Sequence, residues 1–389
     1  MSTNESRRKF IKSAGLITAA ALIPSAIFSA ATNTTNATST AKEPEAEKKD
    51  PKKDVVHYRK LGNTPIVIST VSVGTGSGQT TNVLNYAFEK GINFVHTCRQ
   101  YAGGKSLNAV TEFIKGKREK VVIGMKVSWD VEKDEEFDKL LKSMETDYVD
   151  IAFFQLHKAD EVKKEKYKEA AARWKKSGKI KAIGLTSHGD TVNCMQAALE
   201  LGYFDVLMPS YNLSLEKNFE EVFKLAAEKK VSVILMKTNH GLDAATYEKA
   251  VAKYLSTPAV ITICKSLNSF KVVNEMIEWA NFELNKETEN SIKKSAELTS
   301  IGHCGMCSAC TTACPNKLPV SDVVRCSDYY MTNSTYATTL KDTIANMEIQ
   351  KLADCTNCGA CELSCPRRVP VRNHIARLSI VLNDIKNLA

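Results

Sequence analysis

Eight short runs rich in β-branched residues recur between residues 57 and 266, and most are followed by a stretch whose apolar side chains have helical spacing. One such stretch places Phe137, Leu140, Leu141 and Met144 on one face. Eight strand–helix units in roughly 230 residues predict an α/β fold, the (β/α)₈ TIM barrel. The expected strands are Val71–Gly74, Asn93–Cys98, Val121–Val127, Tyr148–His157, Ile180–Ser187, Val206–Asn212, Ser232–Thr238 and Val260–Ser266.

A doubly wound sheet is the alternative, because it uses the same alternation of strands and helices. That fold would need a glycine-rich turn directly after the first strand, with a helix opening behind it. The segment Gly74-Thr75-Gly76-Ser77-Gly78 has the glycines but not the spacing of the dinucleotide-binding fingerprint. The barrel is therefore the expected fold.

Chemically active side chains gather at the carboxyl ends of the expected strands, where TIM barrels hold their active sites. Taken singly, each histidine or lysine is more simply explained as a solvated or core-satisfied side chain than as a functional one. Placed together on one rim, they predict a catalytic site. The residues in question are His96, Tyr101, Lys126, His157, His188, Lys237 and His240.

From residue 57 to about residue 282 the chain resembles the aldo/keto reductase family. The segments that carry the resemblance are Tyr58–Ser69, Gly91–Tyr101, Lys126, Gln155–His157 and Ile183–Ser187. The resemblance implies carbonyl reduction with NADPH, in which a tyrosine donates the proton and a lysine lowers its pKa. A histidine orients the carbonyl and an aspartate pairs with the lysine. Tyr101, Lys126 and His157 match the tyrosine, lysine and histidine.

Three positions depart from that family pattern. His96 occupies the aspartate position, where a neutral imidazole supplies no counter-charge to Lys126, and we include it among the catalytic candidates. The loop after the eighth strand lacks an arginine, and Met208 replaces a glutamine that contacts nicotinamide. The expected cofactor-binding residues are Ser187, Asn212, Lys265 and Ser266, the last two as a phosphate site at a helix start. The sequence leaves open whether NADPH binds.

Nine of the twelve cysteines follow residue 300, in two copies of the motif Cys-x₂-Cys-x₂-Cys-x₃-Cys-Pro and one further position. In this ferredoxin spacing the first three cysteines hold one [4Fe–4S] cluster and the fourth binds the other cluster. The expected ligand sets are Cys304, Cys307, Cys310 and Cys365 for one cluster, and Cys355, Cys358, Cys361 and Cys314 for the other. Zinc binding and structural disulfides are the alternatives. The helical insert Val320–Leu352 is similar to the helical ferredoxin-type domain that some aldo/keto reductase relatives carry.

The first 31 residues have the character of an export signal. Arg7 and Arg8 precede an apolar run from Ala14 to Ala31, and the small residues at its end predict cleavage near Ala31. The paired arginines resemble a twin-arginine signal, which implies export of a folded protein to the periplasm. An ordinary secretory signal and an uncleaved anchor are the alternatives.

The remaining chain divides by composition. Residues 32–54 read as a disordered tether. The barrel is expected over 55–285, a connector helix over 286–302 and the mainly α-helical ferredoxin-type domain over 303–389. No apolar stretch after the signal is long enough to span a bilayer, so no membrane span is expected in the mature chain.

The combined pattern predicts an exported iron–sulfur oxidoreductase. Its barrel would act on a small-molecule substrate of the carbonyl or alcohol type, and two [4Fe–4S] clusters would relay electrons to or from a redox partner protein or electron carrier. The alternatives are an NAD(P)H-dependent aldo/keto reductase with accessory clusters and a non-catalytic electron-transfer protein with a degenerate barrel. A net charge of +9 over 389 residues gives no reason to expect nucleic-acid binding.

Overall fold

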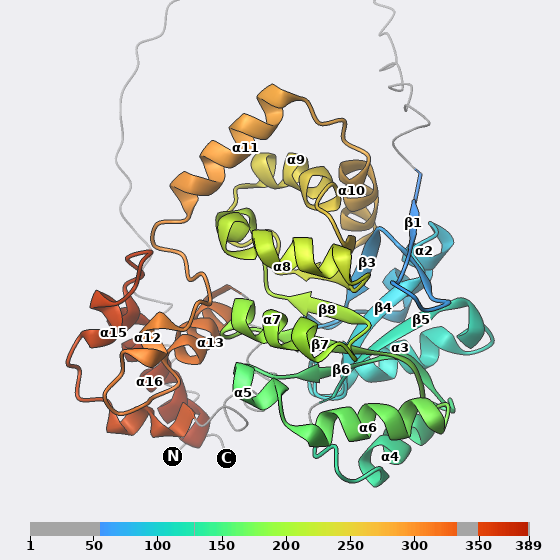
Figure 1. The fold of residues 1–389 in the computed structure, drawn as a ribbon, viewed down its shortest axis with the longest axis horizontal. Coiled ribbons are helices and arrows are strands. Elements are labelled where there is room, and N and C mark those ends of the chain that lie inside the picture. The colour runs from blue at the N-terminus through green and yellow to red at the C-terminus, as the bar shows by residue number, and fades with distance from the viewer. Residues whose placement is uncertain (1–54, 128, 333–348, 388–389) are drawn as a thin grey trace, which may run out of the picture. The chain divides into compact units, whose positions relative to one another are not determined.

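The computed structural model describes residues 55–127, 129–332 and 349–387 (Figure 1). The expected export signal (1–31) and tether (32–54) lie outside these ranges, as do residues 333–348 of the expected helical insert. The described part of residues 49–389 belongs to one compact unit.

Eight parallel strands close into a barrel, which confirms the predicted fold (Figure 1). The strands are neighbours in chain order from β3 to β10, and β10 pairs with β3 to complete the ring. Their bounds are β3 Val71–Gly74, β4 Phe94–Cys98, β5 Val122–Val127, β6 Val149–Gln155, β7 Ile180–Ser187, β8 Val206–Pro209, β9 Ser232–Met236 and β10 Val260–Lys265. The predicted strands differ from these mainly at their carboxyl ends.

Aromatic rings and glycines on neighbouring strands fill the interior of the barrel. Phe94 and Phe153 are fully buried in the inner core. A Cβ atom at Gly184 would lie 2.4 Å from the Phe153 ring, and one at Gly124 would lie 2.9 Å from both rings. The interior is therefore a packed core rather than a channel.

An antiparallel hairpin of β1 (Tyr58–Lys60) and β2 (Val67–Ser69) covers the amino end of the barrel. Leu61 and Ile68 of this hairpin are fully buried and belong to the same inner core. The Gly62 N–H donates a hydrogen bond to Ser232 Oγ at the start of β9 (2.8 Å). The hairpin therefore closes the amino end of the barrel.

Amphipathic helices form the outer layer of the barrel, as their apolar spacing predicts. In α4 the buried residues are Phe137, Leu140 and Leu141. Serine and aspartate side chains cap several helices, for example Asp243, whose Oδ1 accepts the Thr246 N–H at the start of α9 (2.9 Å). The helices are α2 Thr81–Glu89, α3 Lys105–Ile114, α4 Glu135–Ser143, α5 Ala159–Val162, α6 Glu165–Lys176, α7 Thr191–Leu201, α8 Glu216–Glu228, α9 Ala244–Leu255 and α10 Phe270–Ala280.

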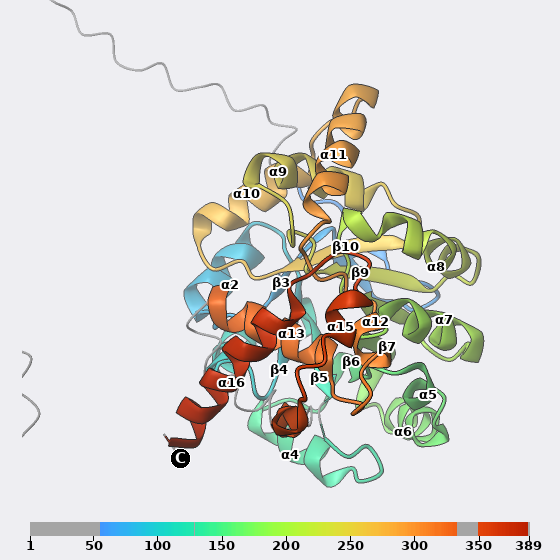
Figure 2. The same cartoon turned by 90° about the vertical axis from the view of Figure 1, so that its left-hand side faces the viewer.

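A mainly helical region follows the barrel, as the sequence predicts. Its core contains Val323, Cys326 and Leu378 and lies where α13 packs against α16 (Figure 2). Its elements are α11 Lys286–Thr299, α12 Ala309–Thr312, α13 Val320–Thr332, the 3₁₀ turn η3 Ile349–Asp354, α15 Ala360–Leu363 and α16 Val371–Asn387. Within the described ranges, no helix combines the length and the apolar character needed to cross a membrane.

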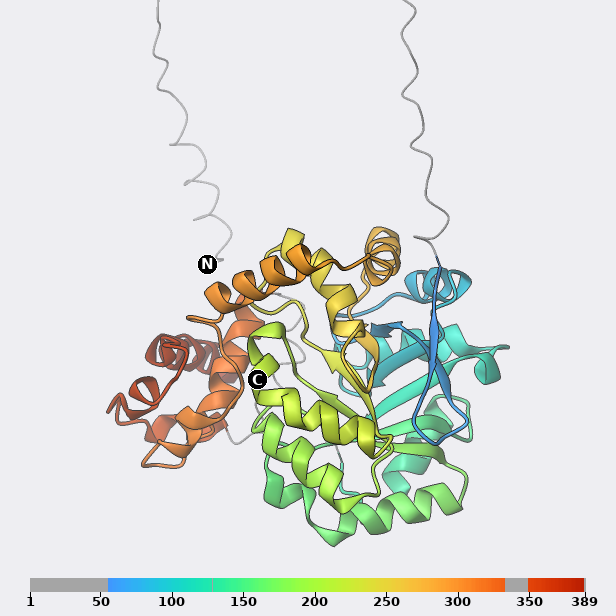
Figure 3. The same ribbon diagram turned by 45° about the horizontal axis from the view of Figure 1, so that its top comes forward.

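Helix α11 connects the barrel with the cysteine-rich region. It packs on α9, with Ile292 and Ala296 buried and a Thr246 Oγ1–Ser295 Oγ hydrogen bond of 3.1 Å. In Figure 3 the orange α11 runs from the yellow helices of the barrel to the red segments at the end of the chain. This helix fixes where the first cysteine motif begins.

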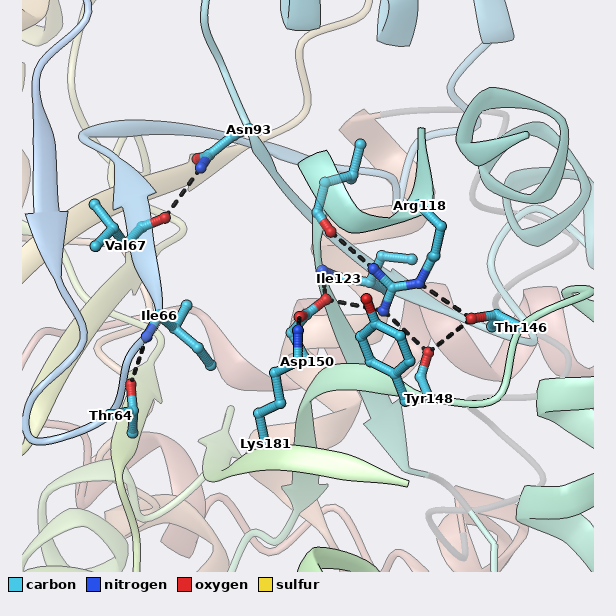
Figure 4. A network of polar contacts seen from close by, with 11 residues as sticks. Thr64, Ile66, Val67, Asn93, Arg118, Ile123, Thr146, Tyr148, Asp150 and Lys181 are labelled. Carbon is cyan, nitrogen blue, oxygen red and sulfur yellow. Dashed lines mark hydrogen bonds and ion pairs between the residues drawn. The ribbon is translucent and has the colours of Figure 1, made fainter. Parts of the chain in front are cut away.

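A buried ionic network ties together the amino ends of three strands (Figure 4). Asp150, near the start of β6, accepts hydrogen bonds from Arg118 Nη2 (2.9 Å), the Ile123 N–H (2.9 Å) and Lys181 Nζ (2.7 Å). The Asp150 side chain is only 5% exposed, so its charge depends on these partners for stabilisation.

Removing this carboxylate should destabilise the barrel. In Asp150→Ala the Ile123 N–H and the Arg118 guanidinium lose their common acceptor, and we expect the free energy of unfolding to fall by about 3 kcal/mol. Urea denaturation followed by circular dichroism measures this. The exposed Asp147 provides the control, since Asp147→Ala should change stability by less than about 0.5 kcal/mol. Equal effects of the two substitutions would contradict the role given to the network.

Candidate functional site

Two cavities in the helical region are lined by four cysteines each. We call the first the proximal cavity, because residues of its lining bond to the barrel, and the second the distal cavity. The proximal cavity is lined by Cys304, Cys307, Cys310 and Cys365, and the distal cavity by Cys314, Cys355, Cys358 and Cys361. In each cavity, three cysteines of one motif meet the fourth cysteine of the other.

The two cysteine motifs follow the same backbone path, 51 residues apart in sequence. Each motif passes through left-handed backbone conformations at equivalent positions and then starts a one-turn helix, α12 or α15. The repeat continues through a short apolar-Pro-Val segment into α13 or α16. The left-handed residues are Met306, Ser308 and Lys317 in the first copy and Asn357, Gly359 and Arg368 in the second. This internal repeat explains why the fourth cysteines exchange between the cavities.

Burial makes two of the proximal cysteines, Cys304 and Cys310, poor free nucleophiles. It raises the pKa of the Cys304 thiol to about 11 and that of Cys310 to about 12. Such thiols become thiolates when a metal takes the place of their protons. The Met306 N–H already donates to Cys304 Sγ (3.4 Å), a bond that favours a negatively charged sulfur. No three His, Cys, Asp or Glu side chains in the described ranges are arranged to hold a single metal ion.

The rim of the barrel brings together Tyr101, Lys126 and His96. The Lys126 ammonium lies 4.7 Å from the centroid of the Tyr101 ring, and the His96 and Tyr101 ring centroids are 6.3 Å apart. His96 is 3% exposed and its Nε2 has no hydrogen-bond partner. Burial, and secondarily the Lys126 charge, lower the pKa of His96 to about 3. The imidazole is therefore neutral at physiological pH.

His157, the fourth candidate for catalysis, is held in one tautomer. Its Nδ1 accepts the backbone N–H of His188 (3.1 Å), so the ring proton of the neutral imidazole resides on Nε2. The Gln155 side chain lies against this atom, with its Nε2 3.0 Å from His157 Nε2. Because both nitrogens are then donors, the amide has to turn its oxygen toward the ring to accept the His157 proton. Burial lowers the pKa of His157 to about 3, with a further contribution from Arg325. His157 can thus donate a hydrogen bond through Nε2 to a substrate oxygen without being charged.

Two of the residues expected to bind a cofactor are engaged within their own loops. Ser187 Oγ donates to the Gly189 carbonyl oxygen (2.7 Å), and Asn212 Oδ1 accepts the Ser214 N–H (3.1 Å), capping the 3₁₀ turn η2 (Leu213–Leu215). Both side chains are buried. Their observed bonds hold the loops that follow β7 and β8.

The other two residues follow the last strand of the barrel. Lys265 ends β10, and its Nζ lies 4.7 Å from the centroid of the Tyr247 ring. Burial, with a contribution from Lys237, lowers the pKa of Lys265. Ser266, the next residue, is half-buried. Met208, at the position of the family's glutamine, is buried in the inner core.

Residues of the helical region reach the rim of the barrel, a contact that the sequence does not predict. The Asp190 N–H, in the loop after β7, donates to Ser308 Oγ (3.0 Å), and Ser308 also lines the proximal cavity. Arg325 of α13 acts electrostatically on His157 and His188 and is ion-paired with Asp322 (2.7 Å). The interactions of Ser308 and Arg325 with the rim join segments more than 100 residues apart, and no local pattern in the sequence predicts them.

His188, one of the rim residues that the sequence places together, lies next to His157. It is 7% exposed, and its Nδ1 lies 2.6 Å from Ser210 Oγ in the loop after β8. Burial lowers the pKa of His188 well below its ordinary value. With its backbone bonded to His157, it is a neutral positioning residue of the rim.

Comparison with known proteins relates the barrel to one family. Residues 74–250 match the aldo/keto reductase family. Among curated proteins, the chain is similar to the uncharacterized oxidoreductase YqkF of Bacillus subtilis (strain 168). The two are 27% identical over 225 residues, which cover 51% of this chain and 72% of that relative.

Solved structures of low sequence identity share the barrel. The aldo-keto reductase AKR11C1 from Bacillus halodurans, in its holo form, is 21% identical with a TM-score of 0.55, and the match covers 62% of this chain and 96% of that one. The aldo-keto reductase from Klebsiella pneumoniae in complex with NADPH is 16% identical with a TM-score of 0.54, with the same two coverages. At these identities the likeness concerns the fold.

The buried neutral histidines make the stability of the barrel depend on pH. The pKa of His96 is 6.5 in its ordinary state and about 3 in the folded protein, so the unfolded chain takes up a proton first as the pH falls. The stability that the neutral ring contributes is complete above pH 6.5 and is lost toward pH 3. We expect His96→Asn to reduce the slope of unfolding free energy against pH in this window by up to about 1.4 kcal/mol per pH unit.

Urea denaturation at a series of pH values below 7 measures that slope. The exposed His57 supplies the matched control, and His57→Asn should leave the slope as it is in the unaltered protein. A slope in His96→Asn equal to that of the unaltered protein would show that this ring does not stay neutral in the folded state.

Proposed function

Residues 74–250 form an aldo/keto reductase domain, the domain of a family of oxidoreductases, and on that premise we propose that this protein is an exported iron–sulfur oxidoreductase. Its barrel interconverts a carbonyl and an alcohol on a small molecule. Two [4Fe–4S] clusters in the helical region connect the barrel with a redox partner protein or electron carrier. The observation that carries the proposal is the placement of eight cysteines around two cavities, one of them bonded to the rim of the barrel.

The cysteine sets fit [4Fe–4S] clusters in number, kind and spacing. Each cavity has four thiols, with three from one motif and the fourth from a Cys-Pro of the other. The Met306 N–H on Cys304 Sγ is the type of bond that tunes such clusters. When bound, the clusters supply one-electron transfer.

The position of the proximal cavity supports a link between its occupant and the barrel. Ser308 lines the cavity and accepts the N–H of Asp190, two residues beyond His188 on the rim. Ser321 and Val324 of α13 line the same cavity, while Arg325 on that helix acts on the rim histidines. Helix α13 thus lines the proximal cavity and also carries the arginine that acts on the rim histidines.

The rim residues supply proton transfer and orientation for the substrate. Tyr101 donates a proton to the carbonyl oxygen, or removes it in the reverse direction, with the Lys126 charge stabilising the phenolate. The Nε2 proton of His157 orients the same oxygen. Reduction of a carbonyl to an alcohol takes two electrons and two protons, so the redox partner exchanges two electrons per turnover, and solvent supplies the second proton.

NADPH-dependent reduction is the second candidate function, and the Klebsiella pneumoniae structure in complex with NADPH is the observation that favours it. In this chain Lys265 and Ser266 remain available for a phosphate at the start of the loop before α10. Ser187 and Asn212, by contrast, form hydrogen bonds within their own loops. Met208 of β8, which stands where the family has a glutamine that contacts nicotinamide, is buried. Binding of NADPH at micromolar concentration, measured by fluorescence titration, would favour this second function over the first.

Export in the folded state fits a protein that acquires clusters before it crosses a membrane. The twin-arginine sequence and cleavage near Ala31 remain sequence predictions, because residues 1–54 lie outside the described ranges. If they are correct, changing Arg7 and Arg8 together to lysine should retain the protein in the cytoplasm with its clusters intact. Cell fractionation with iron analysis measures this, and an unchanged periplasmic yield would indicate the route for unfolded chains.

Anaerobically purified protein should contain about eight iron atoms and eight acid-labile sulfides per chain. Cys310→Ala removes one proximal ligand and should lose about half of the iron or more. Cys326 is the matched control, because it is fully buried in the core of the same region without lining either cavity. Cys326→Ala should keep the iron. Stoichiometric zinc without sulfide would overturn the cluster assignment.

Tyr101→Phe should slow turnover by about 10²–10⁴-fold, the usual effect of losing a positioned general acid, while the iron content stays normal. Turnover is followed with an artificial one-electron dye. Tyr203, whose hydroxyl has no hydrogen-bond partner, gives the control, and Tyr203→Phe should leave the rate unchanged. Equal rates for Tyr101→Phe and the unaltered protein would favour a barrel without catalytic function.

The His96→Asp change tests which chemistry the rim performs. It restores the carboxylate that the family pairs with the lysine, and should impair turnover with the one-electron dye if the rim is built for electrons delivered singly. Recovery of NADPH-linked carbonyl reduction by this variant would instead support the second function.

A further inference from the structure

The proximal and distal cavities are related by the internal repeat, but the charged side chains in their linings differ. After its fourth cysteine the second motif reads Cys365-Pro366-Arg367, where the first reads Cys314-Pro315-Asn316. Because the fourth cysteines exchange, Arg367 lines the proximal cavity and Asn316 the distal one. The repeat therefore places a cation beside one set of cysteines and a neutral amide beside the other.

Arg367 is built into the interface between the proximal cavity and the barrel. Its guanidinium donates to Ser214 Oγ (2.6 Å) and to the Ser214 carbonyl oxygen (2.7 Å), in the turn after β8. Its own carbonyl oxygen accepts the Gly302 N–H (2.7 Å). A Cβ atom at residue 305 would lie 2.5 Å from Arg367 Nε, so glycine at this position lets the guanidinium lie against the Cys304–Cys307 loop. The repeat has a threonine at the equivalent position, Thr356.

Both hydrogen-bond partners that the structure gives the Arg367 guanidinium are neutral, so they leave its charge uncancelled. Arg367 lines the same cavity as Cys304, Cys307 and Cys365, so this charge lies beside these cysteines. Arg367 is also partly withdrawn from solvent, which strengthens its electrostatic effect on its neighbours.

The distal cavity also has an arginine in its lining, but this arginine is exposed and ion-paired. Arg372 is exposed, with 52% of its side chain accessible, and it is ion-paired with Glu362 (3.1 Å). Solvent and the carboxylate therefore screen its charge from the distal cysteines. Arg367 and Arg372 follow Cys365 by two and seven residues, and only the charge of Arg367 lies beside its cysteines without an ionic partner among its hydrogen bonds.

We infer that Arg367 raises the reduction potential of the proximal [4Fe–4S] cluster above that of the distal one, so that the cluster next to the barrel is reduced first. The inference rests on the proposed function, since it requires both clusters. A one-electron reduction adds a negative charge to a cluster, and a nearby uncancelled cation stabilises that charge. Arg367 is thus a positioning and tuning residue rather than a catalytic one.

A redox titration of the anaerobic full-length holoprotein, followed by electron paramagnetic resonance, tests this. We expect two transitions at separate potentials. Arg367→Gln should shift the higher one to lower potential and leave the other in place, whereas Arg367→Lys, which keeps the charge, should shift it much less. Arg372→Gln is the matched control on the distal cavity and should move neither transition appreciably.

A second pair of variants changes the surroundings of the Arg367 charge by substituting a barrel residue, without altering the cysteine loops. Ser214→Asp places a carboxylate beside the Arg367 guanidinium and should lower the same transition, whereas the neutral Ser214→Asn should leave it in place. If Arg367→Gln fails to assemble its clusters, the comparison of Ser214→Asp with Ser214→Asn tests the inference in its place.

The possible failures are distinguishable. Wild-type protein without iron and sulfide would overturn the proposed function together with this inference. Wild-type protein with two clusters whose potentials are unmoved by Arg367→Gln or by Ser214→Asp would overturn the inference alone. A parallel shift of both transitions would also overturn it, because the effect would then not be local to the proximal cavity.

Discussion

The hydrogen bonds that join β10 to β3 determine the position of every rim residue. Ile263, Cys264 and Lys265 pair with the strand Val71–Gly74, and the closed ring that results brings the carboxyl ends of eight strands to one face. Buried hydroxyl groups reinforce this seam, since Ser72 Oγ donates to the Ile263 carbonyl oxygen (3.1 Å). Without closure, side chains from β4, β5 and β6 would lie along an open sheet edge and not around a common centre.

A second level of organisation is the internal repeat of the helical region. Equivalent left-handed turns in the two motifs give both copies the same path, and the packing of α13 on α16 sets the copies against each other. The exchange of the fourth cysteines makes each cavity depend on both halves. Because α13 also carries Arg325 toward the rim histidines, the geometry of the cysteine region and that of the barrel are coupled.

The histidines of the rim are uncharged because they are buried beside positively charged side chains. His96, His157 and His188 are kept neutral by desolvation, and nearby lysine and arginine charges add to the effect. A histidine at position 96, where the aldo/keto reductase pattern has an aspartate, fits this environment, because a neutral ring needs no ionic partner. The substitution removes negative charge from the site but keeps a polar group near Tyr101. In the electron-relay proposal, the rim retains proton transfer while electrons arrive from the helical region.

The sequence by itself determined the barrel, because β-branched runs and amphipathic stretches follow from local side-chain preference and periodicity. Its errors lie at strand ends: the run predicted to continue to Asn212 stops at Pro209, since Asn212 caps the turn that follows. Cysteine spacing likewise predicted two sets of four thiols, and the same two sets line the two cavities of the helical region. Ligation of clusters by these thiols stays a prediction. Only tertiary structure decided that Ser187 bonds to its own loop and that Ser308 and Arg367 meet the barrel. Those contacts join distant segments, and no local preference encodes them.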